Sequence, residues 1–313
     1  MTMLRRLVTT ILSLGCAVGV VACGSPAQSQ IDQGSKLLGQ NKRAEAFAAF
    51  DAAVKLDPNS AGALSGRGCS TPPTDTAAAV ADLNRAIEID PKAVDAYRCR
   101  AEVERRSGQL DSALVDARKA IELNPSHAYP HVTLGNVLDD LGKASEALPE
   151  YDMAIQLEPT LANAYNQRSI ARGHVDDEAG SAADLDKAIE LDPSYGAAYA
   201  ARSMSKMFDG DCKGALADAG KAIQLDPKFP VAYDARAMCR ADAGDLDGAL
   251  RDADQAITLG RRDAFAYWIR GIVRAERGDR VDATADLRRA IELAPSPDFA
   301  DGIRSLMAEY GLE

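Results

Sequence analysis

A repeat of fixed length constrains this chain more than any other feature. The hexapeptide AIELDP, residues 188–193, returns as AIEIDP, AIELNP, AIQLEP and AIQLDP, with looser copies VKLDP, AITLGR and AIELAP. The copies end at residues 58, 91, 125, 159, 193, 227, 261 and 295, so their spacing is 33 residues once and 34 residues six times. A period of this length is typical of a solenoid, in which each repeat stacks on its neighbours.

Each repeat is predicted to be two helices joined by a tight turn. In the copy that ends at Pro227, residues 199–206 show helical spacing, and the apolar residues of 215–223 lie on one helical face. Between them stands Gly210, and glycines equivalent to it are Gly108, Gly142, Gly244 and Gly278, each seventeen residues past the preceding repeat end. Glycine can adopt the left-handed conformation that ends a helix, and the terminal proline ends the next one.

Alanines recur at two fixed points of the second helix, and they predict where helices pack closely. Because alanine lets a neighbouring backbone approach and favours helix, these positions are expected to form the core. The two equivalent sets are Ala113, Ala147, Ala215, Ala249 and Ala283, and Ala120, Ala154, Ala188, Ala222, Ala256 and Ala290.

This pattern of tyrosine, glycine, alanine and proline resembles that of tetratricopeptide repeats. The resemblance covers residues 31–296 as about eight 34-residue helix–turn–helix units. It implies an all-α fold, an α-solenoid wound into a right-handed superhelix. Residues 297–313 carry apolar side chains on one helical face and are expected to form a capping helix. The pattern is broken at residues 70–73, where one residue is missing, at Asp176, which replaces a turn glycine, and at Arg261, which replaces a repeat-end proline.

The N-terminus is predicted to be a sorting signal. Arg5 and Arg6 precede an apolar run, residues 7–21, which is typical of a signal peptide. The run ends Val-Val-Ala-Cys at Cys23, which resembles the lipobox of bacterial lipoproteins. The resemblance implies a signal peptide over residues 1–22, an acylated Cys23, a tether over residues 23–30, and an exported protein anchored by lipid to the outer face of the cell membrane. The alternative is an ordinary secretory signal that is cleaved elsewhere.

Arginine and aspartate recur at equal distances from the turn, which places them level in an antiparallel hairpin. Arg100 lies eight residues before Gly108 and Asp116 eight residues after it. The same pairing recurs as Arg67/Asp82, Arg168/Asp184, Arg202/Asp218, Arg236/Asp252 and Arg270/Asp286. A salt bridge within each repeat is the favoured interpretation, because an arginine near a helix interface needs a partner. A ladder of arginines that binds a substrate is the alternative.

Four cysteines lie beyond the N-terminal signal. Cys69 and Cys99 are 30 residues apart, and Cys212 and Cys239 are 27 apart, each about one repeat. Since exported proteins meet oxidising conditions, these two pairs are predicted to be disulfides. Buried free thiols are the alternative.

Charge and motifs exclude several function classes. The formal net charge of −11 argues against nucleic acid, whose phosphates need a basic face. His127 and His131 are four residues apart, but Pro130 lies between them, so no metal site is predicted. The sequence has no GxxxxGK[ST], HExxH or GxSxG motif. An enzyme is therefore not expected, and no cofactor is implied.

The family resemblance implies a groove, lined by the first helices, that binds peptides or protein segments. Its positions begin charged, with Arg98, Glu102, Arg105 and Arg106, and then become polar, with Asn136, Asn163 and Asn166. Toward the C-terminus they become apolar, with Met204, Met207, Phe208, Met238, Trp268 and Ile272. This apolar set is predicted to be the main binding patch, because methionine and tryptophan suit adaptable protein contacts. The alternative is that these residues are ordinary core.

Together these features predict a lipid-anchored scaffold that binds envelope proteins or their peptide segments. A structural protein that self-associates through its array, without a peptide ligand, is the alternative. The sequence leaves the oligomeric state open.

Overall fold

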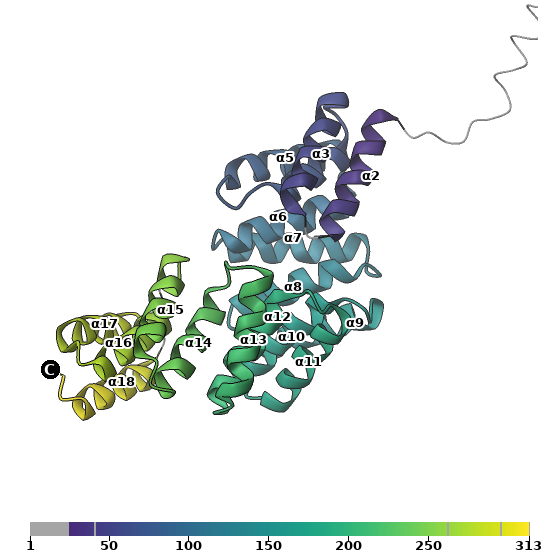
Figure 1. The fold of residues 1–313 in the computed structure, drawn as a ribbon. Coiled ribbons are helices and arrows are strands. Elements are labelled where there is room, and N and C mark those ends of the chain that lie inside the picture. Colours follow the sequence, from purple (N-terminus) through teal and green to yellow (C-terminus); the bar gives the residue numbers. More distant parts are fainter. Residues whose placement is uncertain (1–24, 41, 262, 295, 313) are drawn as a thin grey trace, which may run out of the picture. The chain divides into compact units, whose positions relative to one another are not determined.

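The computed structural model describes residues 25–40, 42–261, 263–294 and 296–312 (Figure 1). Within these ranges the chain forms seventeen α-helices and no β-strand. The expected signal peptide and Cys23 lie outside the described residues. None of the described helices is both long and apolar enough to cross a membrane.

The helices follow the predicted order along the chain: a first and a second helix in each of eight repeats, and then one closing helix. The first helices of the hairpins are α2 (Pro26–Gly39), α4 (Ala61–Ser70), α6 (Val94–Arg106), α8 (Ala128–Asp140), α10 (Ala162–Gly173), α12 (Gly196–Phe208), α14 (Pro230–Asp242) and α16 (Ala264–Arg277). The second helices are α3 (Arg43–Leu56), α5 (Thr76–Ile89), α7 (Leu110–Leu123), α9 (Ala144–Leu157), α11 (Glu178–Leu191), α13 (Cys212–Leu225), α15 (Leu246–Thr258) and α17 (Arg280–Glu292). The closing helix is α18 (Pro297–Glu309).

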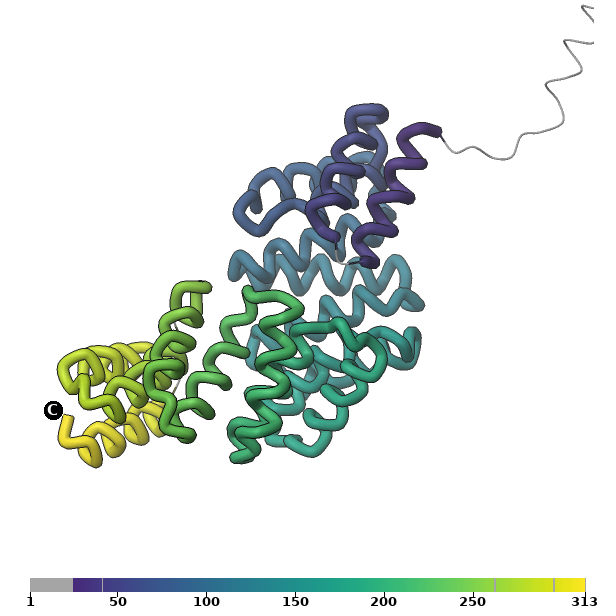
Figure 2. Tube along the Cα trace, in the orientation of Figure 1, coloured from purple at the N-terminus to yellow at the C-terminus, as the bar shows by residue number. Residues whose placement is uncertain are grey.

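The helices divide into two compact units, where the sequence predicted one array. Unit 1 ends at Leu141 and holds α2–α8, and unit 2 begins at Gly142 and holds α9–α18. Within each unit, helices that are consecutive along the chain pack against one another (Figure 2). Most first helices of neighbouring repeats within a unit also touch, as α4 touches α6 and α14 touches α16. We call the surface that they form in each unit the first-helix face.

The recurring hexapeptide is the end of each second helix. The aspartate before the proline, for example Asp57 or Asp192, is the C-cap residue and has extended backbone angles. A residue before proline is pushed to that region, so the helix must stop there. The carboxylate of Asp57 then accepts a hydrogen bond from the backbone N–H of Asn59, 3.1 Å away, and Asp192 does the same for Ser194 at 2.9 Å. The motif therefore ends one helix and turns the chain toward the next.

The predicted turn glycines adopt the left-handed conformation. Gly210 has φ +77° and Gly278 has φ +89°, and the equivalent glycines are similar. Asp176, which replaces glycine in the fifth repeat, has φ +60° and is the one non-glycine residue with positive φ in the described chain. Aspartate tolerates this region better than most residues do, so the turn survives the substitution.

The core is built mainly from alanine. Every one of the eleven predicted core alanines, from Ala113 to Ala290, has 0% exposure. Larger apolar residues such as Leu83, Leu185 and Ile269 fill the remaining space between helices. At the C-terminal end, Ile303 and Met307 of α18 pack on Leu287 of α17 and so cover the last hairpin, as predicted for a cap.

The expected tether is helical for most of its length. Residues 23–30 were predicted to be a linker, but α2 begins at Pro26. Ser25 accepts a hydrogen bond from the backbone N–H of Gln28, 3.1 Å away, and Pro26 occupies the first turn. This is a strong N-terminal cap, because proline is favoured at the first helical positions and serine at the N-cap.

All six predicted arginine–aspartate pairs form. In each, Nε and one terminal nitrogen of the arginine donate to the two oxygens of a single aspartate, as Arg202 does to Asp218 at 2.7 and 2.8 Å. The other five pairs repeat this geometry at 2.6–2.8 Å. In five of the six, the guanidinium also lies 5.3–5.7 Å from the ring centroid of the tyrosine three residues earlier. We call this arrangement the arginine clamp.

Breaking one clamp should destabilise its hairpin. Burial alone would raise the pKa of Asp218, but hydrogen bonds from Arg202 and Lys206 outweigh it and lower the pKa. Arg202→Ala and Asp218→Ala are each expected to cost about 2–4 kcal/mol, because either change leaves a part-buried charge without its partner. The double variant should cost less than the sum of the two single changes.

Chemical denaturation of the four proteins in this cycle measures the coupling. Lys187→Ala is the control, since it breaks only the exposed ion pair with Glu190 and should cost less than about 0.5 kcal/mol. Additive single effects would show that the clamp does not couple the two helices.

Candidate protein-binding site

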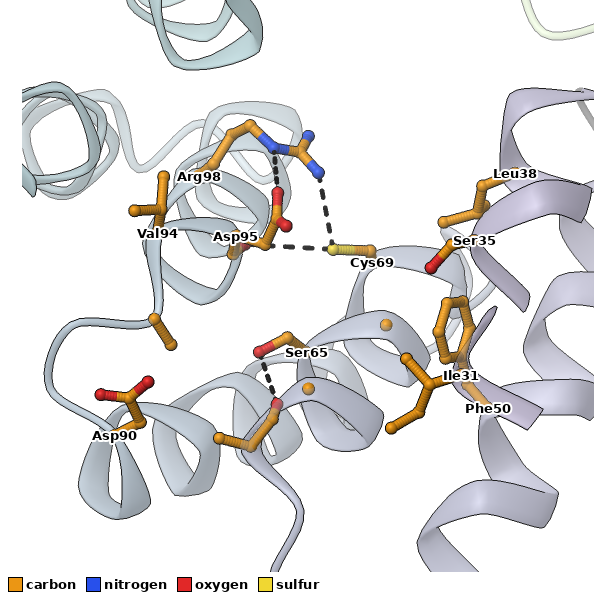
Figure 3. Close-up of a pocket in the computed structure, with 14 residues that line it drawn as sticks. Ile31, Ser35, Leu38, Phe50, Ser65, Cys69, Asp90, Val94, Asp95 and Arg98 are labelled. Carbon is orange, nitrogen blue, oxygen red and sulfur yellow. Dashed lines mark hydrogen bonds and ion pairs between the residues drawn. The ribbon is translucent and has the colours of Figure 1, made fainter. Parts of the chain in front are cut away.

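The first-helix face of unit 1 contains a pocket of about 330 Å³ between α2, α4 and α6 (Figure 3). One side is apolar, with Ile31, Leu38 and Phe50, and Val94 adds to the opposite side. Arg98 and Asp95 pair across 3.0 Å on that opposite side. The pocket therefore combines an apolar wall with a paired charge, which suits a side chain from a peptide segment.

Two glycines create the apolar wall. The ring of Phe50, from α3, passes beside Gly34 of α2 and Gly66 of α4. A Cβ on Gly34 would lie 2.8 Å from that ring, and one on Gly66 would lie 2.1 Å from it. Because neither position has room for a side chain, glycine is required for Phe50 to reach the pocket from the second helix.

A second pocket of about 430 Å³ adjoins the first and is more polar. It shares Cys69 and Arg98 with the first pocket and extends to Arg43, Glu102 and Arg106. The guanidinium of Arg43 donates to the backbone carbonyls of Cys69 and Thr71, at 2.6 and 3.1 Å. Arg106 donates to the backbone carbonyl of Glu102 at 3.1 Å. These cations are thus engaged by the protein itself, and the charged groove predicted at Arg98, Glu102, Arg105 and Arg106 is largely an internal network.

The cysteines are joined in the two pairs that their spacing suggests. Cys69 bonds to Cys99, and Cys212 bonds to Cys239, each with Cα atoms 5.2 Å apart, within the usual range for a disulfide. Cys69 lines both pockets of unit 1 and Cys99 lines the second. One disulfide is therefore part of the wall of the candidate site.

One acid in unit 1 occupies a place that cations hold in unit 2. Glu104 lies four residues after Arg100, whereas Arg172, Lys206, Arg240 and Arg274 stand at the same distance from their clamp arginines. Each of those cations contacts the clamp aspartate at 2.6–2.9 Å. Burial and then the charge of Asp116 raise the pKa of Glu104 to about 6.

Replacing Glu104 by glutamine should therefore stabilise the protein by an amount that grows as the pH rises from about 4.5 to about 6 and is complete above that. The folded-state pKa of Glu104 is raised from the ordinary 4.5 to about 6, so the folded form binds more protons and stability falls as pH rises through that window. At pH 7.5, Glu104→Gln should add about 1 kcal/mol, or a few degrees of Tm, and at pH 4 nothing. Thermal melts at both pH values test this, with the exposed Glu190→Gln as control. An equal gain at both pH values would contradict the assignment.

The first-helix face of unit 2 carries a run of aromatic rings. Phe208 of α12 lies 5.6 Å from Phe265 of α16, which lies 5.1 Å from Trp268. Trp268 in turn lies 6.1 Å from Phe299 of α18, edge to face. Offset and tilted rings at these distances attract one another, so the four side chains form one apolar surface, which we call the aromatic run.

The predicted apolar patch is partly surface and partly core. Phe208 is 63% exposed, and Met204, Met207 and Ile272 are half-buried. Met238 and Trp268 are also half-buried, and both pack against the buried cluster of Ala237, Ala253 and Ile269. The patch and the core alternative therefore each describe some of these residues.

Phe265, the ring at the middle of the run, is not among the residues predicted from the sequence. Phe265 is the fourth residue after a repeat end, at one of the groove positions, and the equivalent Asn163 was included. The signal in the sequence that could have identified Phe265 is that this groove position holds an aromatic residue in the last repeat. Phe265 matters because its ring contacts both Phe208 and Trp268, and so connects two residues that lie in different repeats.

A buried carboxylate lies next to the arginine that contacts the aromatic run. Asp234 of α14 has 0% exposure, and Nε of Arg261 lies 2.9 Å from its Oδ2, although the angles do not make a hydrogen bond. Burial raises the pKa of Asp234 to about 7, and Arg261 opposes that rise. The guanidinium of Arg261 also lies 5.3 Å from the Phe265 ring centroid. Arginine at this repeat end, in place of proline, thus places a cation between the carboxylate and the ring.

The predicted polar stretch of the groove is not a single exposed surface. Asn136 belongs to unit 1 and is half-buried, whereas Asn163 and Asn166 belong to unit 2. Asn163 donates to the hydroxyl of Tyr195 at 3.0 Å. Asn166 is only 4% exposed, so the expectation that it lines an open groove is wrong.

The histidine pair does not come together as a metal site. His131 Nε2 lies 3.1 Å from the carbonyl of Pro125, and His127 is the N-cap residue of α8. No group of three or more histidine, cysteine, aspartate or glutamate side chains in the described ranges is arranged to hold a metal ion.

Comparison with known proteins agrees with the repeat pattern. A family model described as tetratricopeptide repeat matches residues 74–128. No curated protein sequence matches the chain. Among solved structures, a chain of the APC/C hetero-tetramer Cut9-Hcn1 superposes with a TM-score of 0.76 and 13% identity. The match covers 96% of this chain but only 58% of that one.

Two bacterial structures have the same fold. A tetratricopeptide repeat protein from Parabacteroides merdae has a TM-score of 0.53 and 16% identity, over 91% of this chain and 100% of its own. The pilF protein of Pseudomonas aeruginosa has a TM-score of 0.56 and 19% identity, over 69% of this chain and 98% of its own. At these identities the likeness concerns the fold alone.

Proposed function

We propose that this chain, whose repeats match the tetratricopeptide repeat model over residues 74–128, is a scaffold that binds protein or peptide segments on the first-helix face. The observation that carries this proposal is the aromatic run of unit 2. Phe208 is a large apolar side chain left 63% exposed, and it continues into Phe265, Trp268 and Phe299. Contiguous apolar surface that is partly exposed marks an interaction site more often than other surface does.

The chemistry of the run favours an apolar segment as the ligand. Aromatic rings supply large contact area at little entropic cost, and the flanking Met204 and Met207 can adapt their shape to a partner. The APC/C hetero-tetramer shows that a chain with this fold takes part in an assembly with another protein. That example supports a scaffold role here, while the partner is proposed from the chemistry of the face.

We further propose that the protein acts at the cell envelope, held there by lipid on Cys23. The support is the sequence alone: a basic pair, an apolar run and a lipobox-like Val-Val-Ala-Cys. The partners would then be envelope proteins or their peptide segments. Disulfides between Cys69 and Cys99 and between Cys212 and Cys239 are compatible with an oxidising compartment.

The binding face is tested by replacing its most exposed ring. Phe208→Ser should leave the melting temperature within about one degree, because most of the ring is already in water. It should reduce capture of the partner identified by crosslinking at least tenfold, as a lost aromatic anchor of ~1.4 kcal/mol or more requires.

Val281→Ser is the matched control for this experiment. Val281 is 84% exposed on α17, a second helix, so the change removes exposed apolar surface away from the proposed face. Partner capture should be unchanged in this variant. If Phe208→Ser binds as well as the wild type, or if both variants lose binding equally, the aromatic run is not the site.

The lipid anchor is tested by Cys23→Ser. This variant should move from the membrane fraction to the soluble fraction, and the intact mass of the wild-type mature protein should exceed that of its polypeptide by the acyl groups. The lipid proposal fails if the variant still partitions with membranes and the wild type carries no acyl mass.

Self-association is the second candidate function, and the molar mass of the protein in solution distinguishes it from the first. Light scattering of the purified protein should give a monomer if the first-helix face serves a different partner. A stable oligomer that Phe208→Ser dissociates would favour the structural role instead.

A further inference from the structure

The clamp arginines make a second contact that joins consecutive repeats. In four junctions the remaining terminal nitrogen of the arginine donates to an aspartate sixteen residues earlier, on the second helix of the preceding repeat. We call this ion pair the strap. The four straps are Arg67–Asp51 at 2.9 Å, Arg168–Asp152 at 2.6 Å, Arg202–Asp186 at 2.6 Å and Arg270–Asp254 at 3.0 Å.

Two clamp arginines meet no carboxylate at that place. Arg100 donates instead to the neutral amide oxygen of Asn84, at 2.6 Å. For Arg236 the residue sixteen positions earlier is Gly220, which has no side chain. The junction between the second and third repeats and the junction between the sixth and seventh therefore have a clamp arginine but lack the ionic strap. The junction between the third and fourth repeats has no clamp arginine, because Leu134 stands at that position.

The two disulfides lie at these same two junctions. Cys69–Cys99 joins α4 to α6, which belong to the second and third repeats. Cys212–Cys239 joins α13 to α14, which belong to the sixth and seventh. The repeats on either side of the four strapped junctions have no disulfide between them, because the chain has no other cysteine beyond Cys23. Strap and disulfide therefore exclude one another along the array.

We propose that each disulfide replaces a missing strap, so that these two junctions, and only these, depend on oxidation. A dithiol reductant would supply two electrons and two protons to each disulfide, yielding two thiols and its own disulfide. The reduced junctions would then hold by apolar packing, helped at the first of them by the neutral hydrogen bond from Arg100 to Asn84, and neither would have an ionic strap. Since Cys69 and Cys99 line the pockets of unit 1, the first junction couples the redox state to the shape of that face.

Hydrogen exchange of the full-length protein, with and without dithiothreitol, tests where reduction acts. Amide exchange in α4, α6, α13 and α14 is expected to rise at least threefold on reduction. Exchange in α10 and α16, whose junctions are strapped by Asp152 and Asp254, should stay unchanged. A rise spread evenly over all helices, or no rise at all, would overturn the proposal.

A designed strap provides the sharper test. A Cβ placed on Gly220 meets no atom within 4 Å, so Gly220→Asp fits and presents a carboxylate to Arg236 as Asp186 does to Arg202. In reduced protein, Gly220→Asp should slow exchange in α13 and α14 roughly threefold relative to Gly220→Ala, the size expected of one partly exposed ion pair. Exchange in α4 and α6 should not respond.

Gly220→Ala is the matched control because it changes helix propensity without adding a charge. Asn84→Asp should produce the same slowing at α4 and α6 and none at α13 and α14. If alanine and aspartate at position 220 protect the reduced junction equally, the ionic strap contributes nothing, and the disulfide is not its replacement.

Discussion

The arginine clamp is the interaction on which the stack depends. Six of the eight repeats place a guanidinium level with an aspartate that is largely buried; for Asp184 only 4% of the side chain is exposed. Charges removed from water in this way are tolerated only when geometry and hydrogen bonds are good, and the two-point contact at 2.6–2.8 Å provides both. The clamp therefore fixes the register of the two helices.

The clamp is important in this fold because most of the core side chains are small. Where helices meet, the side chain is usually alanine with 0% exposure, so each contact buries little apolar area. Close backbone approach and high helix propensity compensate in part. Directional contacts then carry the specificity that larger interdigitating side chains carry in other folds. A junction that lacks the strap aspartate, as at Gly220, needs another interaction to join its two repeats.

The repeat made most of the fold predictable from sequence. A fixed period places equivalent residues at fixed separations, so the hairpins, the left-handed glycines, the buried alanines and the pairs such as Arg202–Asp218 all follow from local geometry. The predictions that were wrong or incomplete concern residues whose surroundings depend on how neighbouring repeats pack. Whether Asn166 is covered, or whether Phe265 bridges Phe208 and Trp268, is decided by how far each hairpin rotates against the next. Many small packing contacts together set that rotation, so it cannot be predicted from any single residue.

The departures from the repeat are where the two units acquire different chemistry. Scaffold positions hold the same residue from hairpin to hairpin, whereas residues of the first-helix face do not. In unit 1, Gly34 and Gly66 admit Phe50 into a pocket that also contains the ion pair of Arg98 and Asp95. In unit 2, Arg261 replaces a proline and sits between a buried carboxylate and Phe265, beside an open ring surface. A side chain that fits the first pocket gains from enclosure, while one that suits the second face gains from ring contact. The first-helix faces of the two units therefore differ in chemistry: that of unit 1 has an apolar pocket beside an ion pair, and that of unit 2 has a run of rings.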